Sequence, residues 1–316
     1  MGDEIFGPVQ SRRLGLSLGI NHLPQKICTY SCVYCQLGFT RQMRIRRQNY
    51  SDPQSITKLT ELRLNELSRQ GMIPDTITLV PNGEPTLDKR IPEIIHELKS
   101  FRIPVAVITN ASLLWMEEVM QQLSQADIVS VKIDTVNDKV WHRINRPHRS
   151  LVLEKILKGI IEFSKNFSGR LITETMLVNG LNDQPQSAKS LSHYLSQVEA
   201  VQSYIALPLR PPAEDHIIPP DRHTIEEFFE ILTRADLNPF LLSDLPESQF
   251  IGEESSITEL LSILKVHPLE ETEFLHILRK NNIPVSKIQD LILEGVIIKN
   301  KSVNKVFFLF NHSRNN

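Results

Sequence analysis

The stretch Cys28-Thr29-Tyr30-Ser31-Cys32-Val33-Tyr34-Cys35 holds all three cysteines of the 316-residue chain. An odd number of cysteines, crowded within eight residues, cannot form a disulfide framework. In a reducing compartment, such a set is more typical of a metal-binding or catalytic site. Four-iron clusters normally use four cysteine thiolates, so three cysteines without a fourth would leave one iron open to a reactive ligand.

Two simpler interpretations of the same cysteines stay open. The first is a structural zinc site completed by a histidine such as His22, although zinc ligands usually come as two separated pairs and the sequence has no second pair. The second is a group of unrelated buried thiols, which the crowding of the cysteines disfavours.

The composition is that of an ordinary globular protein, with 41% hydrophobic and 23% charged residues. A formal net charge of -2 gives no overall attraction to nucleic acid or membranes, so any anion-binding surface has to be local. No apolar run approaches the roughly 18 residues of a membrane span. The first residues also lack the basic and apolar segments of a signal peptide. We therefore expect a cytoplasmic protein with no membrane partner.

Short apolar runs alternate with longer amphipathic stretches along most of the chain. We expect strands at residues 14–20, 76–80, 105–109, 128–133, 171–178 and 204–207, and a further extended piece at 239–242. Helices are expected at 54–70, 91–100, 113–123, 151–163, 187–198 and 224–233. Repeated βα units of this kind predict an α/β fold with a parallel sheet, either curled or open.

The pattern changes near residue 252, where three short helices and a hairpin are expected. The helices lie at 257–266, 270–278 and 285–293, and the hairpin joins 296–298 to 306–310. This order resembles a small winged-helix domain of the α+β class, so we divide the chain into domains at 1–250 and 251–316. Lys299, Lys301 and Lys305 leave contact with nucleic acid open, but the mixed charges of the third helix favour a substrate or protein contact.

The spacing Cys28-x3-Cys32-x-Tyr34-Cys35 resembles the signature of the radical S-adenosylmethionine (SAM) superfamily. The resemblance implies a partial (βα)6 barrel and one [4Fe-4S] cluster, with Cys28, Cys32 and Cys35 as metal ligands and SAM on the open iron. It also implies that one electron, from an external donor of flavodoxin or ferredoxin type, cleaves SAM to methionine and a 5′-deoxyadenosyl radical. Tyr34 would lie near the adenine of SAM, unless it is a hydrophobic plug in the loop.

A second motif, Pro81-Asn82-Gly83-Glu84-Pro85-Thr86, follows the second predicted strand. It resembles the Gly-Gly-Glu-Pro segment of the same superfamily, with Asn82 in place of the first glycine, and it would present backbone groups to the amino group of SAM. We expect Gly83 to supply an unusual φ and Pro85 to fix the next turn. Glu84 would shape the SAM pocket without binding iron. An ordinary turn of this composition is the alternative.

Polar side chains lie at or near the ends of the following strands. Ligands of parallel α/β folds bind at the carboxyl ends of strands, so we expect a SAM pocket there. Each residue alone could be a cap or a structural hydrogen bond, and Asn110 could begin a helix at Ala111. The strand residues assigned to the pocket are Thr109, Asn110, Lys132, Asp134 and Glu174.

Basic side chains gather in three places that follow the same strands and loops. Runs of charge are usually solvated surface, but these are expected to rim one mouth of the barrel, where Arg suits phosphate and carboxylate groups. We therefore expect an anionic substrate, with RNA as one candidate. The clusters are Arg41, Arg44, Arg46 and Arg47, then Arg143, Arg146, His148 and Arg149, and finally Arg210.

Residues 7–15, 17–21 and Cys35-Gln36-Leu37-Gly38 are similar to a prokaryotic radical SAM group near the wyosine-type tRNA-modifying synthases, and Gln36 is assigned to the SAM site with them. Those synthases carry further cysteines for a second cluster used with pyruvate. This chain has none, so that reaction is not expected. Three functions stay open: a radical SAM enzyme acting on an anionic substrate, an activating enzyme that installs a radical on a partner protein, and a non-catalytic iron–sulfur or SAM-binding regulator.

Replacing Cys28, Cys32 or Cys35 by Ala, one at a time, is expected to abolish the brown absorbance of the cluster or to make the cluster unstable, because each variant loses a thiolate ligand. Visible spectra of the anaerobically reconstituted variants test this expectation. A retained cluster and retained activity in all three variants would contradict the ligand assignment.

Overall fold

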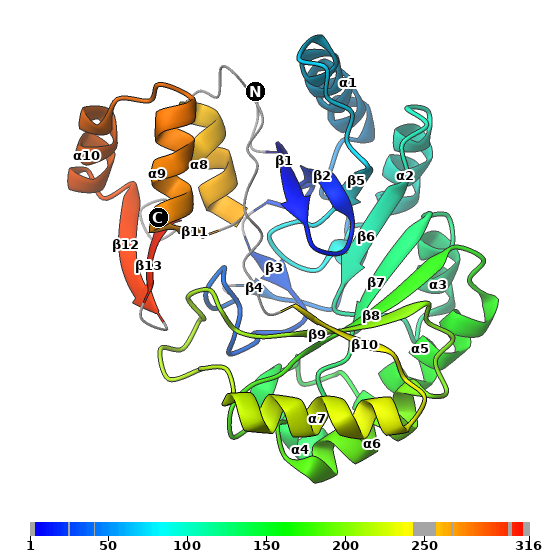
Figure 1. Ribbon diagram of the computed structural model, residues 1–316. Coiled ribbons are helices and arrows are strands. Elements are labelled where there is room, and N and C mark those ends of the chain that lie inside the picture. The colour runs from blue at the N-terminus through cyan, green and yellow to red at the C-terminus, as the bar shows by residue number, and fades with distance from the viewer. Residues whose placement is uncertain are drawn as a thin grey trace.

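The larger part of the molecule is an eight-stranded sheet that curls into an open half-barrel (Figure 1). The computed structural model describes residues 4–24, 26–40, 42–242, 257–266, 268–302 and 305–311. The strand order is β1-β2-β5-β6-β7-β8-β9-β10, in which β1 pairs antiparallel to β2 and every later neighbour pairs in parallel. The strands are β1 (Ile5–Ser11), β2 (Gly15–Ile20), β5 (Thr76–Leu79), β6 (Val105–Thr109), β7 (Ile128–Lys132), β8 (Arg170–Met176), β9 (Gln202–Ala206) and β10 (Pro239–Leu242).

Helices connect the parallel strands and lie outside the curled sheet (Figure 1). Six strands of this sheet, β2, β5, β6, β7, β8 and β9, are each followed by at least one helix before the next strand of the sheet, and β10 completes it. The predicted α/β class and partial (βα)6 barrel are therefore confirmed. The helices are α1 (Pro53–Arg69), α2 (Ile91–Lys99), α3 (Glu117–Leu123), α4 (Asp138–Ile144), α5 (Leu153–Asn166), α6 (Pro185–Leu195) and α7 (Arg222–Arg234).

Alternate residues of the strands face the two sides of the sheet. Val105 and Val107 of β6 belong to the large core that includes Phe163 of α5, whereas Ala106 belongs to a smaller cluster with Ile172 of β8. This period of two places one side chain against the helices and the next inside the half-barrel. Residues of β7 and β8 that follow this inner register therefore project into the concave side of the sheet.

Strand β1 is an element that the sequence patterns did not predict. Its residues Gly7 and Pro8 form a dipeptide that is typical of turns, which hides the strand from a pattern based on apolar alternation. The pairing register with β2 shifts between Phe6 and Val9, so the strand accommodates the dipeptide as an irregularity at the edge of the sheet.

The C-terminal part has the three helices and the hairpin that were expected. It contains α8 (Ile257–Val266), α9 (Glu271–Lys280), α10 (Val285–Leu293), and a sheet of β11 (Leu269–Glu270), β13 (Lys305–Phe310) and β12 (Ile297–Ser302) in that order. Phe274 stacks on Phe308 at 3.9 Å between ring centroids, which ties α9 to β13. Val9 of β1 packs against this core. The winged-helix likeness stays a prediction, and the boundary predicted between residues 250 and 251 lies outside the described residues.

Within the described ranges, no helix has both the length and the apolar character that crossing a membrane requires.

Candidate functional site

The three cysteines lie in a loop that begins at the short strand β3 (Ile27–Cys28), which pairs with β4 (Gln42–Met43). Two tight turns carry the other cysteines, since the backbone N–H of Cys35 donates to the carbonyl of Cys32 at 3.1 Å and that of Gly38 donates to the carbonyl of Cys35 at 3.0 Å. Burial, aided by Glu84, raises the pKa of Cys28 to about 12, and burial, aided by Asp134, raises the pKa of Cys32 to about 11. A metal would therefore have to displace protons from these thiols on binding.

Each cysteine sulfur has an N–H donor from a different part of the chain. Lys26 Nζ lies 3.2 Å from Cys35 Sγ. Asn110 Nδ2, at the end of β6, lies 3.5 Å from Cys28 Sγ. Asn145 Nδ2, which follows α4, lies 3.5 Å from Cys32 Sγ. Donors of this kind stabilise thiolate charge and orient the ligands of an iron–sulfur cluster, so the residues present fit that group.

The cysteines are not arranged around a single ion. Among the residues that the structure describes, no three His, Cys, Asp or Glu side chains form a group that could hold one metal ion. In a four-iron cluster each cysteine binds a different iron, so its ligands are spaced more widely than those of one ion. His22, the histidine considered for a zinc site, has its Nε2 3.5 Å from the carbonyl of Pro85.

Gly83 brings the second motif into direct contact with the cysteine loop. Gly83 pairs with Ile27, and the backbone N–H of Glu84 donates to the carbonyl of Ile27 at 3.0 Å. A Cβ at Gly83 would lie 1.8 Å from that carbonyl oxygen. The expectation of an unusual φ at Gly83 is wrong, because its φ is not positive. The glycine is required because the two backbones approach so closely.

Glu84 is buried and its carboxylate is used inside the protein. It accepts hydrogen bonds from the backbone N–H and hydroxyl of Thr86 at 3.1 and 2.7 Å, from Thr109 Oγ1 at 2.5 Å, and from the backbone N–H of Asn110 at 2.8 Å. Burial raises the pKa of Glu84, although these hydrogen bonds oppose the rise. Glu84 therefore joins the ends of β5 and β6, and Pro85 starts a 3-10 turn, Pro85–Leu87, directly after it.

Asn110 contacts the cysteine loop and does not start a helix. Its Nδ2 donates to Thr29 Oγ1 at 2.8 Å in addition to its contact with Cys28. Ala111 has a φ of 61°, and α3 begins only at Glu117, so the expected helix at 113–123 is shorter at its start. The left-handed residue produces a turn in which Asn110 can face the cysteines.

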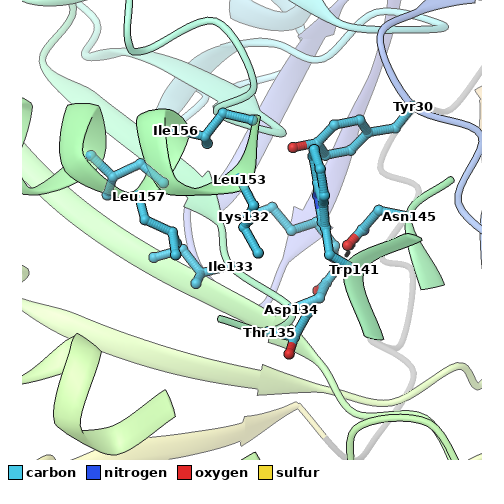
Figure 2. A pocket seen from close by; sticks show the side chains of 11 residues that line it. Tyr30, Lys132, Ile133, Asp134, Thr135, Trp141, Asn145, Leu153, Ile156 and Leu157 are labelled. Carbon is cyan, nitrogen blue, oxygen red and sulfur yellow. Dashed lines mark hydrogen bonds between the residues drawn. The ribbon is translucent and has the colours of Figure 1, made fainter. Parts of the chain in front are cut away.

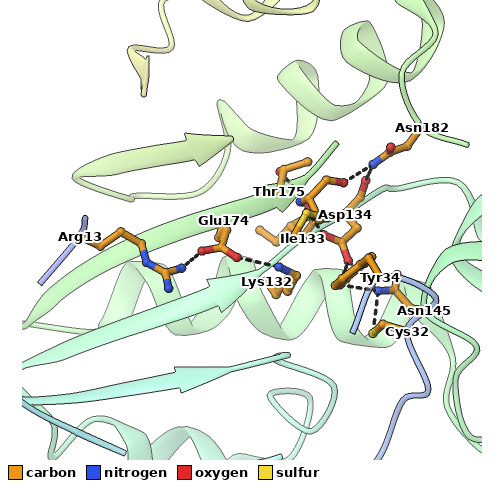
Figure 3. A network of polar contacts seen from close by, with 11 residues as sticks. Arg13, Cys32, Tyr34, Lys132, Ile133, Asp134, Asn145, Glu174, Thr175 and Asn182 are labelled. Carbon is orange, nitrogen blue, oxygen red and sulfur yellow. Dashed lines mark hydrogen bonds and ion pairs between the residues drawn. The ribbon is translucent and has the colours of Figure 1, made fainter. Parts of the chain in front are cut away.

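Asn145, Tyr34 and Asp134 form a buried network beside Cys32 (Figure 3). Tyr34 donates its hydroxyl proton to Asp134, and Asn145 Nδ2 donates to Asp134 Oδ2 at 2.6 Å. The other Asp134 oxygen accepts the backbone N–H of Met176 at 2.8 Å. Burial, followed by the neighbouring Asp134, raises the pKa of Tyr34. Tyr34 is thus fixed in position by Asp134, with its ring 4.9 Å from Lys132 Nζ.

Lys132 and Glu174 form an ion pair inside the half-barrel. Lys132 Nζ lies 2.7 Å from Glu174 Oε1, and Arg13 pairs with the other oxygen of the same carboxylate (Figure 3). Burial lowers the pKa of Lys132. Arg13 comes from the turn between β1 and β2, and only the family resemblance of residues 7–15 pointed towards that segment.

A small pocket lies between the cysteine loop, β7, α4 and α5 (Figure 2). The rings of Tyr30 and Trp141 meet edge to face at 5.8 Å on one side of it, and Lys132, Asp134 and Asn145 contribute its polar wall. Of the residues predicted for the SAM pocket, Thr109 and Asn110 contact Glu84, and Asn110 also contacts Cys28. A second set of contacts joins Asp134 to Tyr34, Tyr34 to Lys132 and Lys132 to Glu174. Gln36 is half-buried just after Cys35.

The basic clusters do not all lie at the rim of the site. Arg47 is buried, donates through Nε to the carbonyl of Thr86 at 2.7 Å and pairs with Glu118 at 3.0 Å, so it holds the second motif in place. Arg146 pairs with Glu214. Three further arginines are exposed, namely Arg46, Arg143 and Arg149. Arg44 and His148 are half-buried, and Arg41 lies outside the described residues.

Sequence reasoning missed Asn145 and Lys26. Asn145 lies between Arg143 and Arg146, which the sequence analysis assigned to a basic cluster, and no spacing rule connects Asn145 with Cys32. Its backbone also contributes, because the N–H of Ser31 donates to the Asn145 carbonyl at 3.0 Å. Only the folded chain places the end of α4 against the cysteine loop.

Comparison with known proteins gives consistent results. The sequence model of the Radical SAM superfamily matches residues 23–190. A UPF0026 protein of Methanocaldococcus jannaschii is 40% identical over 310 residues, which cover 97% of this chain and 95% of the relative. The crystal structure of a radical SAM methyltransferase from Sphaerobacter thermophilus has a TM-score of 0.54 and 16% identity over 71% of this chain and 66% of the other.

The predicted nearness to the wyosine-type synthases is not confirmed. A structure of TYW1 with a lysine-pyruvate adduct covers 94% of this chain and 80% of its own, but its TM-score is 0.42 and its identity 15%. These values are too low to carry an argument about a specific relation.

Gly83→Ala is expected to reduce cluster binding, because the added Cβ would displace Ile27 and with it Cys28. Iron and sulfide content per chain after anaerobic reconstitution measures the effect, and circular dichroism verifies the fold. Gly180→Ala is the matched control, since its Cβ would meet nothing within 4 Å and would add only the strain of a φ of +68°. A full cluster in Gly83→Ala would contradict the role of this contact.

Asn145→Leu is expected to make the reduction potential of a reconstituted cluster more negative, because the variant removes an N–H donor from Cys32 Sγ. We expect up to a tenfold lower ratio of reduced to oxidised cluster at a fixed potential, which corresponds to about 59 mV for one electron. A potentiometric titration followed by electron paramagnetic resonance measures the ratio. The exposed Asn137, replaced by Ser to retain the helix cap, serves as control, and equal potentials in both variants would refute the tuning role.

Proposed function

We propose that this chain, which belongs to the radical SAM superfamily, is an enzyme. It uses one [4Fe-4S] cluster and SAM to act on an anionic substrate. When bound, these groups supply a 5′-deoxyadenosyl radical, with one electron from an external donor of flavodoxin or ferredoxin type. The observation that carries the proposal is the set of three cysteines, each with its own N–H donor, held against the Gly83–Pro85 turn.

The cysteine loop is the proposed cluster site. Cys28, Cys32 and Cys35 would be its ligands, and the sequence contains no fourth cysteine, so one iron would be left for SAM. Asn110 and Asn145 would orient the cysteines through their amide groups, and Lys26 would place a positive charge beside Cys35.

The proposed SAM pocket is formed by residues around this loop. Lys132 and Glu174 offer opposite charges, which suit the carboxylate and the ammonium group of an amino acid. Glu84 would act indirectly, because its carboxylate is committed to Thr86, Thr109 and the backbone of Asn110. The remaining residues assigned to the pocket are Tyr34, Gln36, Gly83, Pro85, Thr109, Asn110 and Asp134.

Two basic segments beside the cysteine loop support an anionic substrate. The backbone N–H of Arg44 donates to the carbonyl of Cys28 at 3.0 Å, and that of His148 donates to the carbonyl of Thr29 at 2.9 Å. The exposed Arg46 and Arg149 are therefore carried by segments that flank the loop. Guanidinium groups at such positions suit phosphate or carboxylate groups.

The experiment is anaerobic incubation of the reconstituted protein with SAM and a strong reductant, followed by chromatography for 5′-deoxyadenosine. The proposal expects its formation by the wild type and not by Cys32→Ala, whereas Asn137→Ser, far from the cysteines in sequence and exposed, should resemble the wild type. An intact cluster that forms no 5′-deoxyadenosine would overturn the proposed activity and favour a non-catalytic regulator.

RNA as the anionic substrate needs a separate measurement. Binding of tRNA across a salt series is expected to weaken as salt rises if phosphates are contacted, because counterions are released on binding. Absence of binding at low salt would exclude the RNA version while leaving the radical chemistry untouched.

A further inference from the structure

The turn between β1 and β2 is fixed at two places on the main sheet. Thr76 Oγ1, at the start of β5, donates to the carbonyl of Leu14 at 3.1 Å. Arg12 Nη1 donates to the carbonyl of Leu242, the last residue of β10, at 2.7 Å. The side chain of Leu14 is buried in the smaller cluster on the inner side of the sheet. These contacts fix the chain on either side of Arg13, which lies between Arg12 and Leu14.

Arg13 reaches from this turn to Glu174, on the inner side of β8 (Figure 3). Arg13 pairs with Oε2 of the carboxylate, and Lys132 Nζ lies 2.7 Å from Oε1. Each carboxylate oxygen therefore has its own cation. The side chains of Arg13, Lys132 and Glu174 are only 19%, 20% and 12% exposed, so water and salt screen these pairs less than pairs on the surface.

The two oxygens of Glu174 have different tasks if Lys132 and Glu174 bind the amino-acid end of SAM. The carboxylate of SAM would take Lys132, and the ammonium group of SAM would replace Lys132 at Oε1. This exchange separates a mostly buried ion pair, and a buried charge that loses its partner is strongly destabilised. Arg13, at Oε2, takes no part in the exchange, so the Glu174 carboxylate would keep one partner throughout.

The second carboxylate near Lys132, that of Asp134, is held in a different way. The charge of Asp134 opposes the effect of burial on the pKa of Lys132. Asp134 also accepts hydrogen bonds from Tyr34 and Asn145, so its position does not depend on Lys132. In the part of the chain that the structure describes, the carboxylate of Glu174 has only its two cations as partners.

We propose that Arg13 is a positioning residue of the SAM site, which holds the Glu174 carboxylate while the other oxygen of that carboxylate changes partner from Lys132 to the ammonium group of SAM. This inference rests on the proposed function and adds a residue of the N-terminal turn to its site. Burial lowers the pKa of Arg13 to about 10, so the guanidinium group stays charged at neutral pH, and its planar donors fix the direction of the bond. Because Arg13 acts on Glu174, its loss should affect the amino-acid end of SAM and spare the adenosine end.

Equilibrium dialysis of the anaerobically reconstituted full chain tests the role of Arg13. The two probes are SAM and 5′-methylthioadenosine, which has the adenosine and the sulfur of SAM without its amino-acid part. We expect Arg13→Gln to raise the dissociation constant of SAM about tenfold and to leave that of 5′-methylthioadenosine unchanged. Arg13→Lys, which keeps the charge without the guanidinium fork, is expected to bind SAM with an affinity between those of the wild type and Arg13→Gln. Arg69→Gln, exposed at the end of α1, is the charge-matched control, and circular dichroism verifies the fold.

Glu174→Gln tests whether Arg13 acts through the carboxylate. This variant is expected to bind SAM more weakly than the wild type. Arg13→Gln is expected to cause no further loss of SAM affinity when it is added to Glu174→Gln, because the charged group that Arg13 holds is then absent.

Three results would overturn the inference: SAM binding in Arg13→Gln that is as tight as in the wild type or tighter, equal weakening of both probes, which would indicate a purely structural role, or a further tenfold loss in the double variant. Formation of 5′-deoxyadenosine from SAM is measured in a separate assay. A protein that forms 5′-deoxyadenosine, but whose Arg13→Gln variant binds SAM like the wild type, would contradict the positioning role alone. A protein that shows the expected binding pattern without forming 5′-deoxyadenosine would contradict the proposed activity alone.

Discussion

The close approach of two backbones, at Gly83 and Ile27, is the constraint on which the site depends. It places the turn after β5 directly against the strand that ends in Cys28, with 3.0 Å between the Glu84 nitrogen and the Ile27 oxygen. Glu84 then continues the connection by joining that turn to the end of β6. Because Asn110 follows β6 and reaches Cys28, a single series of contacts links two parallel strands to the cysteine loop.

The cysteine loop is held by neutral amides as well as by one lysine. Asn110 and Asn145 come from the ends of different elements and contact different cysteines, and Asn145 also donates to Asp134. An amide donor does not gain or lose a proton at ordinary pH, so its contribution to a thiolate is constant. Lys26 adds a full charge at Cys35 alone. The three cysteines therefore lie in unequal electrostatic surroundings although they belong to one short motif.

The sequence allowed the architecture to be predicted because the relevant signals are local. Short apolar runs mark β6 to β8, and the crowding of Cys28, Cys32 and Cys35 marks the site without any structure. The prediction failed where a role depends on a distant neighbour. Arg47 resembled a residue of the rim, yet it is buried against Thr86, and the need for Gly83 comes from Ile27 and not from its own φ. Asn145 has a partner 113 positions away, which no periodicity reveals.

The backbone contacts of the cysteine loop bear on how a cluster could be assembled. Ser31 bonds to Asn145, Arg44 to Cys28 and His148 to Thr29, all through main-chain groups that need no metal. The conformational entropy of this loop is therefore lost when the chain folds, in contrast to small zinc domains that become ordered only on binding metal. A chain whose cluster has been destroyed by oxygen would keep these main-chain contacts of the cysteine loop, and a new cluster could be built on the same chain without unfolding it.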